Sequence, residues 1–344
     1  MRERINWIDW GKALAVITVV FCHLPQSQEW FYYRYLQTCI ISIFFFLSGY
    51  LKKDRGSNKE NWRKYWHGLI LPYIIYNALV YPYWLAKYYI QNSGFPDIYT
   101  ALRPVLGALL LEHENAFCEP LNGPLWYLPA ILFMHILIDI CRQTRFLHHI
   151  MLTLCIVFFF IYAANKTWEF IPNLTPIGIF SRLPIYYIGY VMGQKELFRG
   201  VNFRQDFITG VLLLVISIAL FQWHLHLFYW GDMSHFSSFD FLLHITLFFP
   251  VNICFIFGSL CLCKTLNRIH SSIIVNLSIG TLVIVGLHIV LVTIANFAFE
   301  HLLHIQGVIC YHWYEALPLA FVISLVLYPV IIWGKKHFPV LIGR

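Results

Sequence analysis

The chain has 344 residues, of which 59% are hydrophobic and only 12% are charged, and its mean hydropathy is +0.64. Soluble domains carry about 25% charged residues, so this composition excludes an ordinary water-soluble domain and predicts an all-α, polytopic membrane protein. The formal net charge of +7 does not indicate nucleic-acid binding, because the basic residues are not gathered into one patch.

Ten hydrophobic runs between charged or turn-rich segments predict ten transmembrane helices. They cover approximately residues 8–26, 37–51, 67–91, 124–141, 147–164, 178–195, 207–227, 240–263, 274–298 and 313–334. An eleventh segment, 98–111, contains Arg103-Pro104 and is too short to cross comfortably, so we predict that it is re-entrant or interfacial. With no soluble domain, long linker or internal repeat, residues 1–344 read as a single membrane domain.

The basic residues favour ten spans over eleven. With the N-terminus in the cytoplasm, ten spans place eighteen of the 24 lysines and arginines on the cytoplasmic side and five outside. An eleventh crossing would reverse the side of every later loop and remove this asymmetry. The positive-inside rule therefore predicts ten spans with both termini in the cytoplasm. No small-residue cleavage site precedes Pro25, so the first span is expected to stay as a signal anchor.

The first span carries three ionisable residues on one side: Asp9, Lys12 and His23. Eleven residues amount to roughly 1100° of helical rotation, which places Lys12 and His23 on one face, about 16 Å apart along the axis. Asp9 is three residues before Lys12 and lies on the same side. Ionisable groups inside a membrane helix indicate a functional site. The alternative is an Asp9–Lys12 ion pair near the interface and one hydrogen-bonded core histidine.

The second span ends in Ser48-Gly49 at the inner face and is followed by a basic loop from Lys52 to Lys64. A pair of small residues allows two helices to approach closely. The same polar step, beside a basic cluster, could seat a donor that bears phosphate. Both interpretations remain open.

These residues carry a family resemblance. The chain has a basic residue, ten intervening residues and a histidine (Lys12 to His23), then a Phe-Phe-x-Leu-Ser-Gly stretch that ends at Gly49. A later Gly-Pro-Leu-Trp-Tyr-Leu-Pro segment contains Trp126 and Tyr127. In these features the chain resembles the acyltransferase-3 superfamily of integral membrane acyltransferases, and most of all its fucose 4-O-acetylase type. The resemblance covers essentially the whole chain, although many relatives have arginine where Lys12 stands.

The resemblance implies transfer of an acyl group, most simply acetyl, from cytoplasmic acyl-CoA to a hydroxyl. The acceptor would be a cell-envelope saccharide or its lipid-linked precursor at the bacterial cytoplasmic (inner) membrane. His23 matches the essential histidine of the family and would act as general base, a role suited to an imidazole near neutral pH. No cofactor is expected besides the acyl-CoA substrate. The oxyanion could be stabilised by Lys12, by the indole NH of Trp126 or by backbone NH groups.

Further candidates have two interpretations each. Trp126 and Tyr127 begin the fourth span, where they would form an aromatic belt or stack on a sugar. Arg182 would anchor to lipid headgroups or bind an anionic lipid-linked acceptor. His288, in the ninth span, would be a packing histidine or, by the family match, a site residue.

Other polar residues are weaker candidates. One of Glu112, Glu114 and Glu119 could orient the base, although a solvated loop carboxylate is the simpler interpretation. No metal site is predicted, because the nine cysteines lack zinc spacing and the outer histidines lack a convincing ligand pattern. These histidines are His224, His226, His235, His301, His304 and His312.

Two other functions compete with acyl transfer. A proton-coupled transporter or exporter of a glycan precursor would use Asp9, Lys12, His23 and His288 as a proton relay. Against it stand the missing repeat and the lack of paired broken helices in the sequence. The third possibility is a family member that has kept the fold and lost the activity.

Overall fold

The computed structural model describes the whole chain except residues 1–3, 54–57, 113–116, 169–175, 224–237 and 303–308. The described residues form helices and contain no strand, which confirms the all-α prediction. In chain order the elements are α1 (Asn6–His23), α2 (Phe31–Leu51), α3 (Asn58–Tyr65), the π-helix η1 (Trp66–Ile70), α4 (Leu71–Asn92), α5 (Ile98–Leu109), the 3₁₀-helix η2 (Gly123–Trp126), α6 (Tyr127–Cys141), α7 (Leu147–Trp168), α8 (Pro176–Gln194), α9 (Phe203–Trp223), α10 (Ser238–Thr265), α11 (Ser272–Ile279), α12 (Thr281–Leu302), α13 (Trp313–Val326), α14 (Tyr328–His337) and the 3₁₀-helix η4 (Pro339–Ile342).

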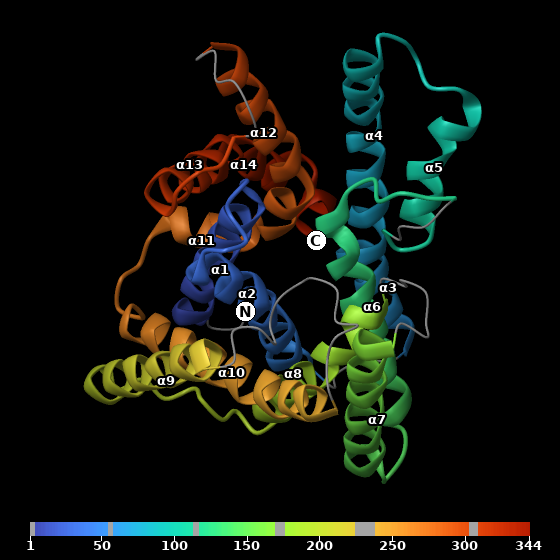
Figure 1. The fold of residues 1–344 in the computed structure, drawn as a ribbon. Helices are drawn as coiled ribbons and strands as arrows, with labels where there is room; N and C mark the ends of the chain where they lie inside the picture. Colours follow the sequence, from blue (N-terminus) through green and yellow to red (C-terminus); the bar gives the residue numbers. More distant parts are fainter. Residues whose placement is uncertain (1–3, 54–57, 113–116, 169–175, 224–237, 303–308) are drawn as a thin grey trace.

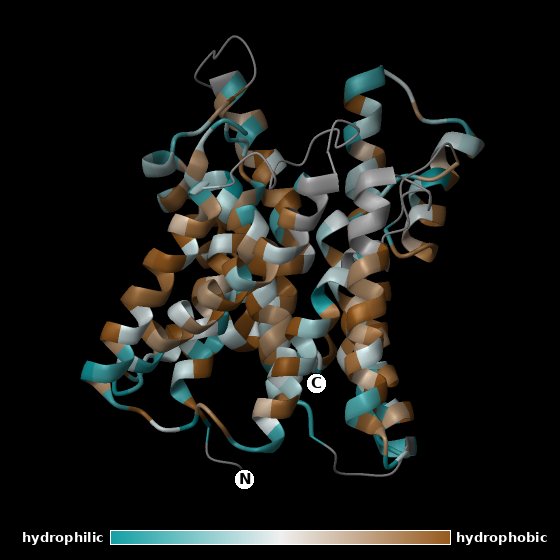
Figure 2. Ribbon diagram, turned by 60° about the horizontal axis from the view of Figure 1, so that its bottom comes forward, coloured by the Kyte–Doolittle hydropathy of each residue, from teal (hydrophilic) through white to brown (hydrophobic). Residues whose placement is uncertain are grey.

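The helices have the apolar surface of a membrane protein. Among the described residues, seven helices are long and apolar enough to cross a bilayer, which confirms a polytopic membrane protein. Figure 2 shows hydrophobic ribbon through the middle of the molecule and hydrophilic ribbon at its two ends. Each of the ten predicted spans contains a helix, but three of these helices fall outside the seven. The count of ten spans therefore stays a prediction.

α1 lies at the centre of the helical bundle and packs against α2, α10, α11, α12 and α13 (Figure 1). It runs antiparallel to α2. At one end the rings of Trp7 and Tyr50 are 5.8 Å apart, and at the other the Tyr33 hydroxyl donates to the Cys22 carbonyl. The end of α2 that leads into the basic loop therefore lies beside the start of α1, whereas His23 is at the opposite end.

Segments predicted to share a side of the membrane contact one another. At the predicted cytoplasmic end, Asn6 donates to the carbonyl of Ile269, and Lys264 forms an ion pair with Asp206. At the predicted outer end, the Tyr311 amide donates to the Pro25 carbonyl. These contacts are those that an alternating order of crossings requires.

α2 and α8 touch backbone to backbone. A Cβ added to Gly49 would lie 2.0 Å from the Tyr186 carbonyl oxygen, and one added to Gly189 would lie 2.2 Å from the Phe46 carbonyl oxygen. Only glycine fits at such positions, which is the small-residue packing expected between membrane helices. Gly49 thus joins α2 to α8, and a contact between Gly49 and substrate stays a prediction.

Two predicted spans are interrupted. The span predicted at 274–298 divides at Gly280 into α11 and α12, and the one at 313–334 divides at Leu327 into α13 and α14. Pro329 follows the second break and has no N–H to continue the helical ladder. The breaks are neighbours, because a Cβ on Gly280 would lie 2.4 Å from Ile331 of α14. The helical hydrogen bonds nevertheless continue across both positions, since the Ile284 amide donates to the Gly280 carbonyl and the Ile331 amide to the Leu327 carbonyl, and Trp313–His337 is long enough to form one span. The lack of paired broken helices therefore stays a prediction.

The predicted short segment forms α5, a twelve-residue helix at the edge of the molecule beside α4 (Figure 1). It begins at the N-cap Asp97, whose side chain accepts the Thr100 amide. Many of its apolar side chains are exposed, with Ile98 81% and Leu109 72% accessible. Twelve residues extend about 18 Å, which is too short to cross a bilayer core of about 30 Å.

Candidate active site

His23 and His288, which are far apart in the sequence, face one another in the fold. Their ring centroids are 4.8 Å apart in an edge-to-face arrangement. His23 is the last residue of α1 and is exposed, whereas His288 is completely buried in α12. The sequence marked both residues, and the structure adds that they form a pair.

Hydrogen bonds to the backbone set the orientation of both rings. His23 Nδ1 is 2.7 Å from the carbonyl oxygen of Val19, and His288 Nδ1 is 2.8 Å from that of Ile284. A carbonyl oxygen only accepts, so each neutral ring carries its hydrogen on Nδ1 and its lone pair on Nε2. His23 therefore presents an unprotonated nitrogen at an exposed position, as a general base requires.

Asp9 and Lys12 are not paired with each other in the described part of the chain. Asp9 is buried and accepts hydrogen bonds from Arg4 and from the Ser278 hydroxyl of α11. The Asp9–Lys12 ion pair considered from the sequence is absent among the described residues. Lys12 forms no hydrogen bond or ion pair there, and it lies on the same helix as His23, about 16 Å away at 1.5 Å per residue.

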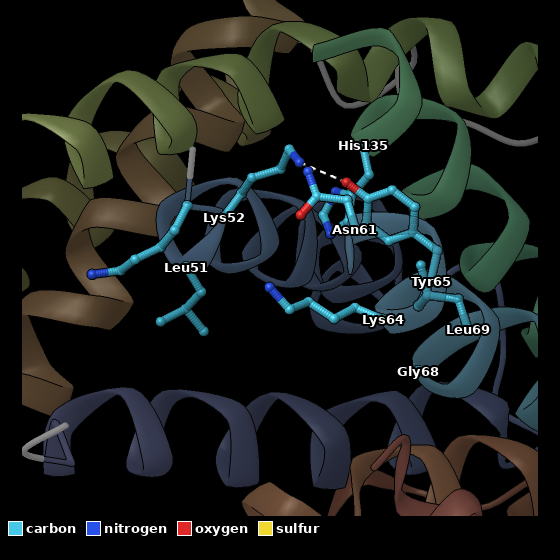
Figure 3. Close-up of a pocket in the computed structure, with 9 residues that line it drawn as sticks. Leu51, Lys52, Asn61, Lys64, Tyr65, Gly68, Leu69 and His135 are labelled. Carbon is cyan, nitrogen blue, oxygen red and sulfur yellow. Dashed lines mark hydrogen bonds between the residues drawn. The ribbon is translucent and has the colours of Figure 1, made fainter. Parts of the chain in front are cut away.

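A basic pocket lies at the other end of the bundle. It has a volume of about 580 Å³ and is bounded by the end of α2, by α3, η1 and α6 (Figure 3). Its lining residues are Leu51, Lys52, Lys53, Asn61, Lys64, Tyr65, Gly68, Leu69 and His135. Gly68 and Leu69 belong to η1, and π-helical turns of this kind are frequent at functional sites.

The three lysines of this pocket differ in their partners. Lys52 is buried and turned toward Tyr65, with its Nζ 2.8 Å from Asp139. Lys53 and Lys64 form no ion pair within the described residues. The charge of Lys52 is thus neutralised inside the protein, whereas Lys53 and Lys64 leave the pocket cationic and able to bind an anion.

Asp139 holds the walls of the pocket together. It accepts hydrogen bonds from Lys52 of the α2 end and from Asn61 and Tyr65 of α3. Arg142 is a further partner, with its Nε 3.6 Å away. Four charged or polar side chains from three segments therefore converge on one carboxylate of α6.

Tyr127 lies closer to the basic pocket than the sequence predicted, because its side chain contacts Ser48. The Ser48 hydroxyl is 2.7 Å from that of Tyr127, which also donates to the Phe44 carbonyl. Ser48 is only one helical turn from Lys52, so Tyr127 lies inside the bundle and its predicted place at the outer interface is wrong. Trp126 packs on Phe45 of α2 with ring centroids 5.9 Å apart. The reason is that η2 carries the start of α6 inward.

Arg182 is also inside the bundle. Its side chain donates to the Thr38 carbonyl and to Asn252, and its guanidinium lies 4.8 Å from the centre of the Phe248 ring. The residue is 5% exposed, so the alternative in which it anchors to lipid headgroups is wrong. A contact between Arg182 and an acceptor stays a prediction.

The remaining sequence candidates have structural partners or lie outside the described residues. Glu112 is buried and accepts the Asn122 amide, and burial raises the pKa of its carboxyl. Glu119 packs against Gly107 through its backbone. His312 stacks on Trp30. The candidates not described are Glu114, His224, His226, His235, His304 and the side chain of His301. In the described part of the chain, no three His, Cys, Asp or Glu residues are grouped to hold a metal.

Sequence reasoning missed His135 and Asp139. Both lie in the fourth predicted span, and the spacing of four residues places them on one helix face. The rule that directed attention to Asp9 and His23, that ionisable groups in a span indicate function, applies equally to this pair. Tyr65 gave no such signal, because tyrosine is common near membrane interfaces.

The fold and these residues define a polytopic helical membrane protein with a pair of histidines at one end of the bundle and a cationic pocket at the other. The family model described as an acyltransferase domain, the acyltransferase-3 family, matches residues 5–336. The chain therefore belongs to the acyltransferase-3 family of membrane acyltransferases. No curated protein and no solved structure matches the chain.

Proposed function

We propose that the protein is a membrane O-acyltransferase, most simply an O-acetyltransferase. It would move an acetyl group from cytoplasmic acetyl-CoA to a hydroxyl of a cell-envelope saccharide or its lipid-linked precursor. The observation that supports the proposal is the orientation of His23, an exposed residue whose lone pair is on Nε2 because Nδ1 is bound to the Val19 carbonyl. Family membership supplies the reaction class.

The basic pocket fits the donor. CoA carries phosphates that cannot enter hydrocarbon. Lys53 and Lys64, which form no ion pair with the residues that the structure describes, offer two cations at the predicted cytoplasmic end. The stretch of α2 from Tyr33, beside His23, to Lys52 is about 28 Å long at 1.5 Å per residue. The thioester arm would therefore extend along the bundle, past Ser48 and Tyr127, while the phosphates stay at the pocket.

The chemistry follows from this placement. His23 Nε2 takes the proton of the acceptor hydroxyl, whose oxygen attacks the thioester carbonyl. The new ester bond forms as the carbon–sulfur bond breaks. Lys12, about 16 Å from His23 along α1, would lie too far from the reacting carbonyl to stabilise its oxyanion, so that role would fall to the indole NH of Trp126 or to backbone NH groups.

Removing the base tests the proposal. His23→Ala should leave the protein in the membrane but remove acetylation of the surface glycan, measured by mass spectrometry of polysaccharide from complemented cells. Loss of a general base costs about 10²–10⁴ in rate. His148→Ala, which changes an exposed histidine of α7, is the control. Normal acetylation by the His23 variant would overturn the catalytic assignment. The mass of the added group also separates acetyl from succinyl.

A transporter is the second candidate, because a completely buried ionisable residue such as His288 is what a proton relay through the membrane would use. Reconstituted vesicles distinguish the two. An enzyme consumes acetyl-CoA and releases the CoA thiol without net solute flux, whereas a transporter moves the glycan precursor and leaves acetyl-CoA intact. The second result would overturn the proposal.

A further inference from the structure

The buried ring of His288 has an unused nitrogen. Its Nδ1 is bound to the helix backbone, while its Nε2 has no hydrogen-bond partner among the residues that the structure describes. A buried polar atom without a partner costs stability, so its presence needs an explanation. The ring of His23 lies next to that of His288, with centroids 4.8 Å apart in an edge-to-face arrangement.

The two rings cannot hydrogen-bond to each other while both are neutral. Each carries its hydrogen on Nδ1, where it is donated to a carbonyl oxygen, so each Nε2 has only a lone pair. This changes when His23 receives a proton on Nε2. The imidazolium then bears a positive charge beside a buried neutral ring that offers a lone pair and a π face, and both attract that charge.

We propose that His288 is a positioning residue that stabilises the imidazolium formed on His23 during acyl transfer; this inference rests on the proposed function. The proton of the acceptor hydroxyl passes to His23 Nε2 while the acceptor oxygen bonds to the acyl carbon. The carbon–sulfur bond breaks and its electron pair goes to sulfur. The proton then moves from His23 to that thiolate, giving the ester and the CoA thiol. His288 forms and breaks no bond.

A purely structural role for His288 predicts a different dependence of kcat on the side chain at this position. If His288 only fills space, the shape of its ring matters and phenylalanine should serve nearly as well. If it stabilises charge, the acceptor nitrogen matters, and phenylalanine should fail even though it packs. Glutamine tests the converse, because its amide oxygen restores an acceptor without a ring.

The experiment compares His288→Phe and His288→Gln with the wild type in nanodiscs. Acetyl-CoA is the donor, chemically O-deacetylated surface glycan of the source cell is the acceptor, and release of the CoA thiol is measured. We expect His288→Phe to lower kcat about 10- to 100-fold, the effect of losing one hydrogen bond to a charged group. KM for acetyl-CoA should stay within about twofold. His288→Gln should recover part of the loss.

The control is His148→Phe, since His148 also has its Nδ1 bonded, to the Tyr187 hydroxyl, but lies in α7 away from His23. Melting temperatures identify variants that fail to fold, and His288→Leu then replaces His288→Phe. A wild-type kcat in His288→Phe overturns this inference alone, as does a His288→Gln variant no faster than His288→Phe. A wild type that releases no thiol overturns the proposed function, and this inference with it.

Discussion

Replacing Asp139 with asparagine should destabilise the end of the bundle that is predicted to be cytoplasmic. The carboxylate is the common partner of Lys52, Asn61 and Tyr65, and its side chain is only 12% exposed. The substitution keeps the shape of the side chain but leaves the Lys52 ammonium, 4% exposed, without its counter-charge. Removing one member of a buried ion pair typically costs 3–5 kcal/mol, because the remaining charge is still desolvated.

We expect a loss of about 3 kcal/mol, toward the lower limit because the amide oxygen of asparagine can still accept a hydrogen bond from Lys52 and because Arg142 can turn toward solvent. The assay is thermal unfolding of the purified protein in detergent, followed by tryptophan fluorescence. The double variant Lys52→Met with Asp139→Leu removes both charges and should recover more than half of the loss. Wild-type stability of Asp139→Asn, or a double variant less stable than that single one, would refute the reasoning.

Three further outcomes are expected. Gly189→Ala should lower stability by about 1–3 kcal/mol, since its methyl group would lie 2.2 Å from the Phe46 oxygen, whereas Gly200→Ala, with open space around it, should be neutral in the same unfolding assay. Lys64→Gln should raise KM for acetyl-CoA about fivefold, most strongly at low salt, as measured by thiol release. Burial raises the pKa of Glu112, so the folded protein should lose stability as pH rises from the ordinary carboxyl value of about 4.5 to the raised value, and the melting temperature of Glu112→Gln should change less over that range.

Each of these three has an outcome that contradicts it. Equal melting temperatures for the two glycine variants would mean that α2 and α8 accommodate the added methyl group without loss of stability. Lys195→Gln, which changes another exposed lysine, should leave KM unchanged, and an equal effect of both lysine variants would remove the special role of Lys64. A steeper pH dependence in Glu112→Gln than in the wild type would reverse the sign derived from burial.

The fold class was predictable because it depends on composition. Runs of apolar residues long enough for a bilayer can form only helices there, whatever their neighbours. The choice of His23 as a candidate has a similar basis, since an ionisable group in such a run is costly and indicates function, and its role as a base stays a prediction. The contact between Asp9 and Ser278 could not be predicted, because packing between α1 and α11 brings the two residues together and the local sequence does not show that packing.

The depth of Tyr127 within the bundle could not be predicted from the sequence either. Tyr127 begins a hydrophobic run, and hydropathy places such a residue at the membrane surface. Its contact with Ser48 shows that the preceding segment enters the bundle before the helix starts. Hydropathy treats each run as a straight crossing of the same thickness, so it cannot detect a chain that reaches the interior through a short 3₁₀ turn.

The glycine contacts between α2 and α8 limit how the protein can move. Where two main chains touch, no flexible side chain is present to absorb sliding, so the helices must travel as one stiff unit. α2 bears Ser48 and leads directly into Lys52, so the wall that α2 forms along the proposed donor route would be rigid. In the proposed reaction, any widening that admits a sugar would therefore come from other elements, such as α12, which carries His288.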